Sequence, residues 1–288
     1  MKTKGLIISA CMLILIGCAE VILPSSAPQL VIEGWIENGM NPVVMITTTV
    51  PVNSEVKDVE QLKDYIVTWG KVTISDGQDT VIMTGKADKR YFPPYIYTTS
   101  RMKGEVGKTY SIKVEYSGRT ATATTTIPKP ADLEYMKVIW VSDESYTIAA
   151  GLRDDPSEKN YYKSFVRIFG KDSTYTPSFM GLTDDAVLSE EIEELPVNNS
   201  LNNLFEKRGS SFSPKDTVIV RFCTLDEASY NYWSDFDDIT SLSKNPFFPV
   251  TSSIRSNIKG GLGYWAGYGS AYYRVSIPDS LAAGRIYR

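Results

Sequence analysis

The feature that most constrains the fold is a series of β-type runs separated by turn dipeptides. Asn38-Gly39, Asp76-Gly77 and Ser117-Gly118 each lie between two such runs, which is the signal of a β-hairpin. Between residues 110 and 116, every second side chain is tyrosine, isoleucine or valine, the period of a half-buried strand. Turns spaced about 8 to 12 residues apart without a helical period predict a mainly β protein with a β-sandwich in its N-terminal half.

Two β-rich domains are predicted within the 288 residues, enough chain for two ordinary hydrophobic cores. The first domain is expected over 29–128, where Pro128 and Pro130 stiffen a linker, and the second over 131–288. In the second domain, the polar segment 174–211 is expected to form long loops. The segment DEASYNYWSDFDDITSL, from Asp226, predicts one short helix because its apolar residues recur every three positions.

The first 17 residues have the pattern of a signal peptide. Lys2 and Lys4 precede a short apolar stretch that is too short to be a convincing membrane-spanning helix. Leu15-Ile16-Gly17-Cys18 then matches the lipobox of bacterial lipoproteins, which predicts lipidation of Cys18 and a tether over 18–28. The alternative is an ordinary secretory signal with an unrelated cysteine.

Charge and residue content bear on the classes of function. Removal of the leader takes away two lysines, so the net charge becomes 28 − 34 = −6, unfavourable for nucleic-acid binding. Histidine is absent, which removes the usual general base and the commonest zinc ligand. We therefore expect no enzyme activity, no cofactor and no metal site, although loop aspartates leave calcium binding open. Cys223 is the one cysteine expected to remain free, as a buried and inert thiol.

The C-terminal stretch NIKGGLGYWAGYGSAYYRV, from Asn257, combines glycines with aromatic residues. Its spacing departs from a dinucleotide-binding loop, and the predicted helix precedes it, so the glycines are interpreted as positions of close backbone approach. Most of its aromatic residues are expected in the core. Tyr264, Trp265 and Tyr268 are candidate contact residues if this segment is exposed, and Tyr95 and Tyr97 are candidates in the loop YFPPYIY.

The order of several motifs resembles the Bacteroidetes lipoprotein family called domain of unknown function 4249. These motifs are the lipobox, LVIEGWI, KVTISDG, GKTYSIKV, TTTIPKP, DDPSEKNYYKSF, VIVRFCTLDEASYNYW and SNIKGGLGYWAGY. The resemblance implies an immunoglobulin-like N-terminal β-sandwich and a β-rich C-terminal domain. It also implies genes beside TonB-dependent outer-membrane transporters of the starch-utilisation type. No catalytic residues are carried over from the family.

These observations lead to the expectation of a non-catalytic outer-membrane lipoprotein that assists a TonB-dependent transporter in nutrient capture and uptake. Its localisation is expected on the cell surface, but Ala19-Glu20 lacks the acidic run of a strong surface-export signal, which leaves the periplasmic face open. Two alternatives remain: a free-standing adhesin or glycan- or peptide-binding module, and a carboxylate-dependent hydrolase. The ligand is not encoded in any motif of the sequence.

Overall fold

The computed structural model describes residues 27–50, 60–142, 144–189, 191–201, 209–242, 254–279 and 286–287. The predicted signal peptide, the lipidation at Cys18 and most of the tether lie outside the described residues. Within them, strands dominate, and one α-helix, α2 (Glu227–Leu242), accompanies short 3₁₀ turns. The predicted mainly β class is therefore confirmed. No helix among the described residues has the length and apolar composition needed to cross a lipid bilayer.

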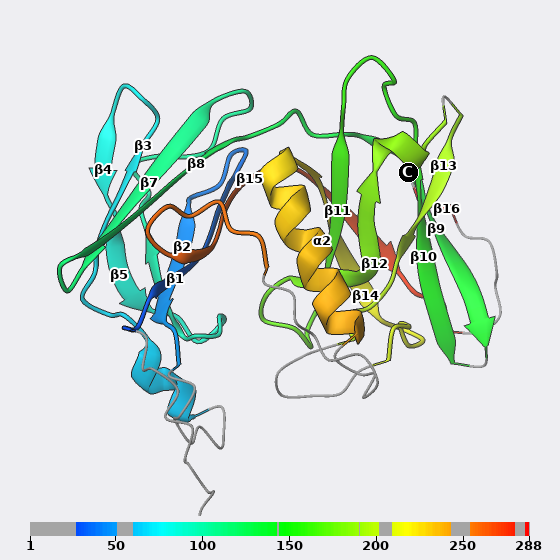
Figure 1. Ribbon diagram of the computed structural model, residues 1–288. Helices are drawn as coiled ribbons and strands as arrows, with labels where there is room; N and C mark the ends of the chain where they lie inside the picture. Colours follow the sequence, from blue (N-terminus) through cyan, green and yellow to red (C-terminus); the bar gives the residue numbers. More distant parts are fainter. Residues whose placement is uncertain are drawn as a thin grey trace, which may run out of the picture.

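The N-terminal strands form a sandwich of two sheets (Figure 1). The strands are β1 (Leu30–Glu37), β2 (Val43–Thr48), β3 (Lys71–Ser75), β4 (Thr80–Ile82), β5 (Thr84–Ala87), β6 (Tyr95–Thr98), β7 (Thr109–Tyr116) and β8 (Arg119–Thr126). They are ordered β1-β2-β6-β5 in one sheet and β4-β3-β7-β8 in the other. This is an immunoglobulin-like arrangement. The first sheet corresponds to strands A, B, E and D, and the second sheet corresponds to an extra strand, C′, followed by C, F and G.

The predicted hairpins are present in this sandwich. Ser75 pairs with Thr80 across the Asp76-Gly77 turn, and Tyr116 pairs with Arg119 across Ser117-Gly118. Ser117 and Gly118 have φ values of 48° and 73°, as a tight two-residue hairpin turn between twisted strands requires.

A second sandwich follows the linker. One sheet contains β9 (Leu133–Ser142), β10 (Ser145–Leu152), β13 (Glu193–Val197) and β16 (Ile286–Tyr287). The facing sheet contains β11 (Tyr161–Ile168), β12 (Thr176–Asp184), β14 (Thr217–Leu225) and β15 (Leu262–Ser276). The expectation of long loops over 174–211 is wrong, because β12 and β13 lie there. Both are edge strands: β12 has mostly half-exposed residues, which weakens the apolar alternation that marks a strand, and β13 has only five residues.

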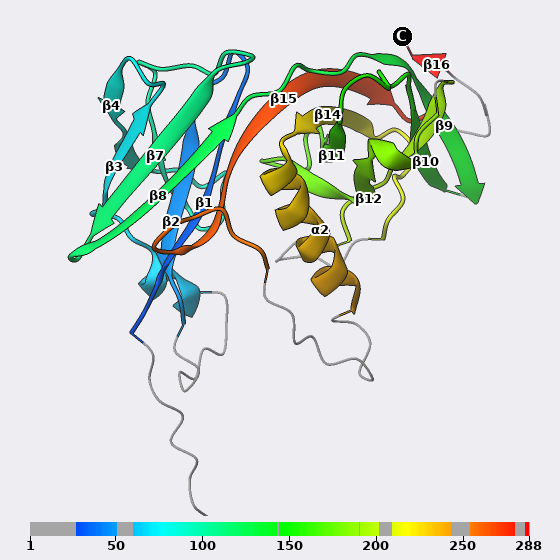
Figure 2. The same ribbon diagram turned by 45° about the horizontal axis from the view of Figure 1, so that its top comes forward.

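Strand β15 joins the two sandwiches. Its first half pairs in parallel with β1, from Leu262 to Tyr268, and its second half pairs antiparallel with β14, from Gly269 to Ser276. This creates one eight-stranded sheet with the order β12-β11-β14-β15-β1-β2-β6-β5. Figure 2 shows β15 arching from one sandwich to the other. The strand that the sequence assigned wholly to the second domain thus also belongs to the N-terminal sheet.

The two faces of β15 have different roles. On one face, Trp265 lies in the N-terminal core and Val275 lies in the C-terminal core. The other face, with the same face of the neighbouring strands, is turned away from both cores and is called the outer face below. Helix α2 packs on this outer face through Trp233, among other aromatic residues. The predicted helix is confirmed, and the Asp226 carboxylate caps its N-terminus by accepting a hydrogen bond from the Ser229 amide.

Candidate functional site

The candidate site lies on the outer face where the two sandwiches meet. Glu37, the last residue of β1, is buried there, and three side chains from the second sandwich surround its carboxylate. Ser270 Oγ and Tyr272 Oη each donate a hydrogen bond to Glu37 Oε2 at 2.7 Å, and Arg221 Nη1 donates to Glu37 Oε1 at 3.3 Å. A single carboxylate therefore connects β1 to β14 and β15.

Aromatic rings enclose the other side of Arg221. Its guanidinium carbon lies 4.3 Å from the ring centre of Phe165, 5.0 Å from that of Tyr175 and 5.4 Å from that of Tyr268. Burial lowers the pKa of Arg221, but the Glu37 carboxylate, together with Cys223, Tyr272 and Tyr268, more than offsets burial and raises the pKa above its ordinary value. The cation is thus held by its carboxylate partner and by the negative faces of the rings.

Next to this buried pair, the outer face carries an exposed group that we call the junction patch: Phe169, Tyr175, Tyr272 and Arg274. The guanidinium carbon of Arg274 lies 5.7 Å from the ring centre of Phe169, and the ring centres of Tyr175 and Tyr272 are 6.0 Å apart. Phe169 and Tyr272 are exposed large side chains, and Tyr175 is half-buried. The patch therefore places three aromatic rings and a cation on a surface that the buried pair fixes.

The loop YFPPYIY also helps to form the junction. The ring centres of Tyr91 and Trp35 of β1 are 6.1 Å apart. Ser173 Oγ donates a hydrogen bond at 3.1 Å to the carbonyl of Arg90, the residue directly before this loop. Ser173 directly precedes the segment that carries Tyr175. The loop of the first sandwich thus contacts the second sandwich beside the junction patch.

Beneath helix α2, the outer face holds two further buried ionisable groups. Lys163 Nζ lies 2.8 Å from Asp237 of the helix, and burial lowers the pKa of Lys163 while Asp237 opposes that shift. Tyr264 Oη donates to Glu33 at 3.1 Å, and burial raises the pKa of Glu33. Each group has a specific partner: the Lys163–Asp237 pair holds the helix on the sheet, and the Tyr264–Glu33 hydrogen bond joins β15 to β1 beneath it.

Nucleophilic chemistry at the junction is disfavoured by the state of Cys223. Burial raises the pKa of this thiol to about 12, so it is protonated at neutral pH. Its Sγ lies 3.5 Å from Ser270 Oγ, and the residue is buried as the sequence predicted. Among the described residues, no group of three or more acidic or cysteine side chains could hold a metal ion.

The structure corrects the expectation of a contact surface at Tyr264, Trp265 and Tyr268. All three are buried in β15, since the segment is a strand and not an exposed loop tip. Trp265 Nε1 donates to the Tyr110 carbonyl at 3.0 Å, and Trp233 Nε1 donates to Tyr268 Oη at 3.1 Å. Trp265 fills the N-terminal core, and Tyr264 and Tyr268 are packed between the outer face and helix α2, which agrees with the expected burial of most aromatic residues of this stretch.

Tyr97 is also buried, and Tyr95 is half-buried, so these two residues form no exposed contact surface either. Tyr97 Oη donates to the Val67 carbonyl at 2.8 Å, and Tyr95 Oη donates to the Thr68 carbonyl at 3.0 Å. Both hydroxyls therefore fix the loop before β3. Sequence reasoning missed Glu37, Arg221 and the junction patch; only the adjacent Tyr272-Tyr273, which must face opposite sides of a strand, signalled part of it.

The glycines of β15 serve the close approach that was predicted for glycines of this stretch. A Cβ on Gly267 would lie 2.6 Å from the Thr126 carbonyl oxygen, and one on Gly269 would lie 2.4 Å from that of Pro128. These distances are far below van der Waals contact, so only glycine allows β15 to cross the end of β8 and the linker.

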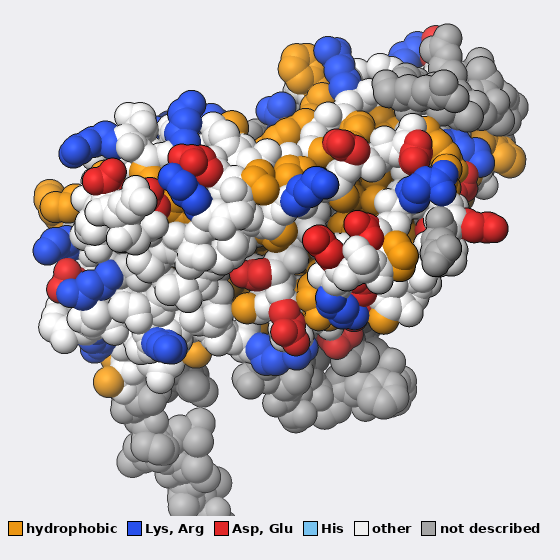
Figure 3. All heavy atoms as spheres, turned by 90° about the horizontal axis from the view of Figure 1, so that it is seen from above, with side chains coloured by type: hydrophobic (Ala, Val, Ile, Leu, Met, Phe, Trp, Pro, Cys, Tyr) orange, Lys and Arg blue, Asp and Glu red, His pale blue; other side chains and the backbone are white. Residues whose placement is uncertain are grey.

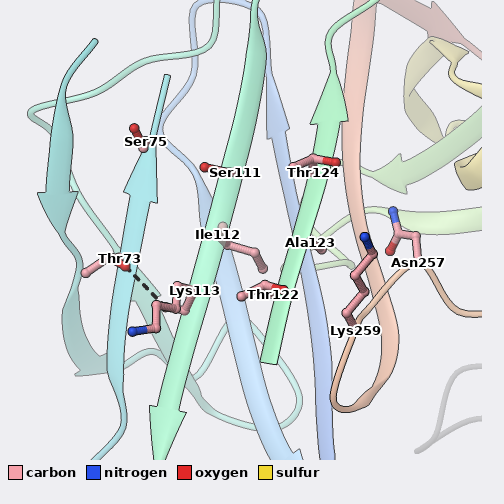
Figure 4. Close-up of a pocket in the computed structure, with 10 residues that line it drawn as sticks. All are labelled: Thr73, Ser75, Ser111, Ile112, Lys113, Thr122, Ala123, Thr124, Asn257 and Lys259. Carbon is pink, nitrogen blue, oxygen red and sulfur yellow. Dashed lines mark hydrogen bonds between the residues drawn. The ribbon is translucent and has the colours of Figure 1, made fainter. Parts of the chain in front are cut away.

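A shallow hollow of about 230 Å³ lies on the exposed face of the first sandwich (Figure 4). Hydroxyl groups of Thr73, Ser75, Ser111, Thr122 and Thr124 line it, with Lys113, Asn257 and Lys259 at its sides. The hollow is smaller than the ~300 Å³ at which small-molecule sites begin, and no aromatic side chain lines it. Asn257 is already hydrogen-bonded to Trp265, so it serves the fold.

Charges of both signs are mixed over the face shown in Figure 3, with Lys and Arg beside Asp and Glu and no broad area of one sign. Ion pairs on the protein include Lys137 with Glu194 at 3.1 Å. This face lacks the continuous basic stripe that binding to a phosphate backbone requires.

Comparisons with known proteins place the chain in a family. No curated protein matches it. A solved cytokine receptor complex covers 88% of this chain and 98% of its own, at 9% identity and a TM-score of 0.24. The FN1-FN3 domains of chicken CNTN1 cover 88% and 68%, at 10% identity and a TM-score of 0.24. Such low scores support no argument, so the sandwich topology rests on the strand order above. The family profile described as Domain of unknown function (DUF4249) matches residues 20–274, and the chain therefore belongs to this family.

Proposed function

We propose that the protein is a lipid-anchored, non-catalytic accessory of a TonB-dependent outer-membrane transporter, where it assists nutrient capture and uptake. The signal peptide and the lipobox at Cys18 support the anchor. An anchored protein is confined to the membrane plane, which raises its effective concentration beside a transporter. Cell-surface attachment is the proposed localisation.

The junction patch is the observation that carries this proposal. Protein interfaces are enriched in aromatic residues and arginine, and their strongest contacts gather around such anchors. Phe169, which directly follows β11, and Tyr272 of β15 are exposed beside Arg274, and the Glu37–Arg221 pair ties β14, which lies between β11 and β15, to β1. A rigid patch loses little conformational entropy when a partner covers it. We assign the transporter contact to this patch.

A non-catalytic role is supported by the state of the buried groups. Arg221, Lys163 and Glu33 each have a partner on the outer face, and the raised pKa of Cys223 keeps its thiol protonated. The three charged side chains are each engaged by a separate partner, which favours a role in positioning over one in acid–base or nucleophilic chemistry.

Co-purification from outer membranes tests the proposal. Tagged full-length protein, solubilised in detergent, is expected to recover a TonB-dependent transporter. The double variant Phe169→Ala with Arg274→Ala is expected to recover several-fold less. Ile82→Ala on β4 is the matched control, because Ile82 is 64% exposed and Phe169 is 62% exposed. Repeated recovery of the lipoprotein alone would contradict the proposal. Glycan binding without transporter recovery would favour a free-standing adhesin.

A further inference from the structure

Trp69 is the most exposed large hydrophobic side chain in the described part of the chain, with 91% of its surface accessible. It lies in the loop between the 3₁₀ helix η2 (Gln61–Tyr65) and strand β3. Exposure of nearly a whole indole is costly in water, since this side chain has a large apolar surface. Exposure alone identifies no partner for a single side chain, so the support and the position of this indole carry the argument.

The backbone on both sides of Trp69 is held in place. Tyr97 Oη donates to the Val67 carbonyl and accepts from the Gly70 amide, both at 2.8 Å. Tyr95 Oη donates to the Thr68 carbonyl at 3.0 Å. These three hydrogen bonds fix the loop, so the indole projects from a preformed support. Preorganisation of this kind lowers the entropic cost of contact with a partner surface.

Trp69 lies at the end of the first sandwich where strand β1 begins. Val31 at the start of β1 pairs with Thr47, and Thr47 forms a bridge to Ile66, three residues before Trp69. Figures 1 and 2 show η2 and the start of β1 at the same end of the sandwich. From Cys18 to Ala27, the first described residue, the chain advances 27 − 18 = 9 residues. Nine residues span at most about 30 Å, so a lipid on Cys18 keeps this end near the bilayer.

We propose that Trp69 inserts its indole into the headgroup region of the membrane that carries the lipid anchor. Tryptophan prefers this region because its ring is apolar and its N–H can hydrogen-bond to water or headgroups. Two described cations near this loop are paired, Lys63 with Glu60 and Lys71 with Glu115 at 3.6 Å, and the proposed contact relies on the indole and not on anionic lipid. The inference rests on the proposed anchor at Cys18. A second point of attachment restricts rotation of the sandwiches about the tether.

Fluorescence in vesicles tests this inference. The full-length lipidated protein is reconstituted into phosphatidylcholine vesicles, and the emission of Trp69 is obtained as wild type minus Trp69→Phe. We expect this emission to shift to the blue, to be quenched by lipids brominated near the headgroup, and to lose several-fold in acrylamide quenching. Trp140→Phe gives the matched control: Trp140, on the second sandwich, is 41% exposed and should stay accessible to acrylamide.

The outcomes separate this inference from the proposed function. If the protein floats with the vesicles but Trp69 stays accessible to acrylamide, the inference is overturned and the anchor stands. If Trp69 is shielded without quenching by brominated lipid, a protein covers it and the inference is again overturned. Equal shielding of Trp140 would contradict the assignment to this end of the molecule. If the protein fails to float, the proposed anchor fails, and the inference falls with it.

Discussion

Replacement of Glu37 by glutamine is expected to destabilise the junction strongly. The substitution keeps the shape of the side chain but leaves the Arg221 cation buried without its carboxylate. Removal of one partner from a buried ion pair costs about 3 to 5 kcal/mol. At the lower end, about 3 kcal/mol, the melting temperature of a chain of this size should fall by about 6 to 12 °C. Urea unfolding followed by tryptophan fluorescence measures the loss.

The double variant Glu37→Leu with Arg221→Met provides the control for this prediction. It removes both charges and fills the space with apolar groups, a replacement that is often neutral. We expect the double variant to be more stable than either Glu37→Gln or Arg221→Met alone. The reasoning is refuted if Glu37→Gln unfolds at the wild-type urea concentration. It is also refuted if the effects of Glu37→Leu alone and Arg221→Met alone simply add in the double variant, since a coupled pair cannot behave additively.

Three further predictions concern single positions. Gly267→Ala should lower the free energy of unfolding by about 1 to 3 kcal/mol, because the new methyl group would meet a backbone carbonyl, whereas Gly209→Ala has space and should change it by less than about 0.5 kcal/mol; thermal unfolding compares them. Cys223 should resist a thiol reagent at pH 8 in the folded protein and react after unfolding, because burial raises its pKa to about 12; fast labelling of the folded protein would contradict this. Glu33→Gln should raise stability at pH 7 and leave it unchanged near pH 4. The raised pKa of Glu33 means that the folded state binds more protons than the unfolded state above the ordinary pKa, so stability falls as pH rises there; urea titrations at both pH values measure the difference.

Local features of the fold could be predicted from the sequence. The hairpins at Asp76-Gly77 and Ser117-Gly118 depend on turn residues and on the alternation of their own strands. Helix α2 depends on its apolar period and on the Asp226 cap. These signals lie within about twenty residues of chain, where pattern and structure are directly linked.

The site could not be predicted because its contacts join distant parts of the chain. Glu37 and Arg221 are separated by 184 residues, and neither spacing nor composition brings them together. The same holds for the aromatic residues of β15. Whether Tyr264 and Trp265 are exposed depends on the parallel pairing of their strand with β1, which lies far from it in the sequence. Exposure of Trp69 likewise follows from the packing of Tyr95 and Tyr97 around its loop.

Site-specific photocrosslinking in intact outer membranes tests the proposed role most directly. A photoreactive residue replaces Phe169 in the junction patch of the full-length protein, and a matched probe replaces Ile82 on the opposite edge of the first sandwich. We predict that the probe at 169 forms a covalent product with a TonB-dependent transporter and that the probe at 82 forms much less of it. Crosslinks from position 169 to no transporter, in cells that produce both proteins, would contradict the account.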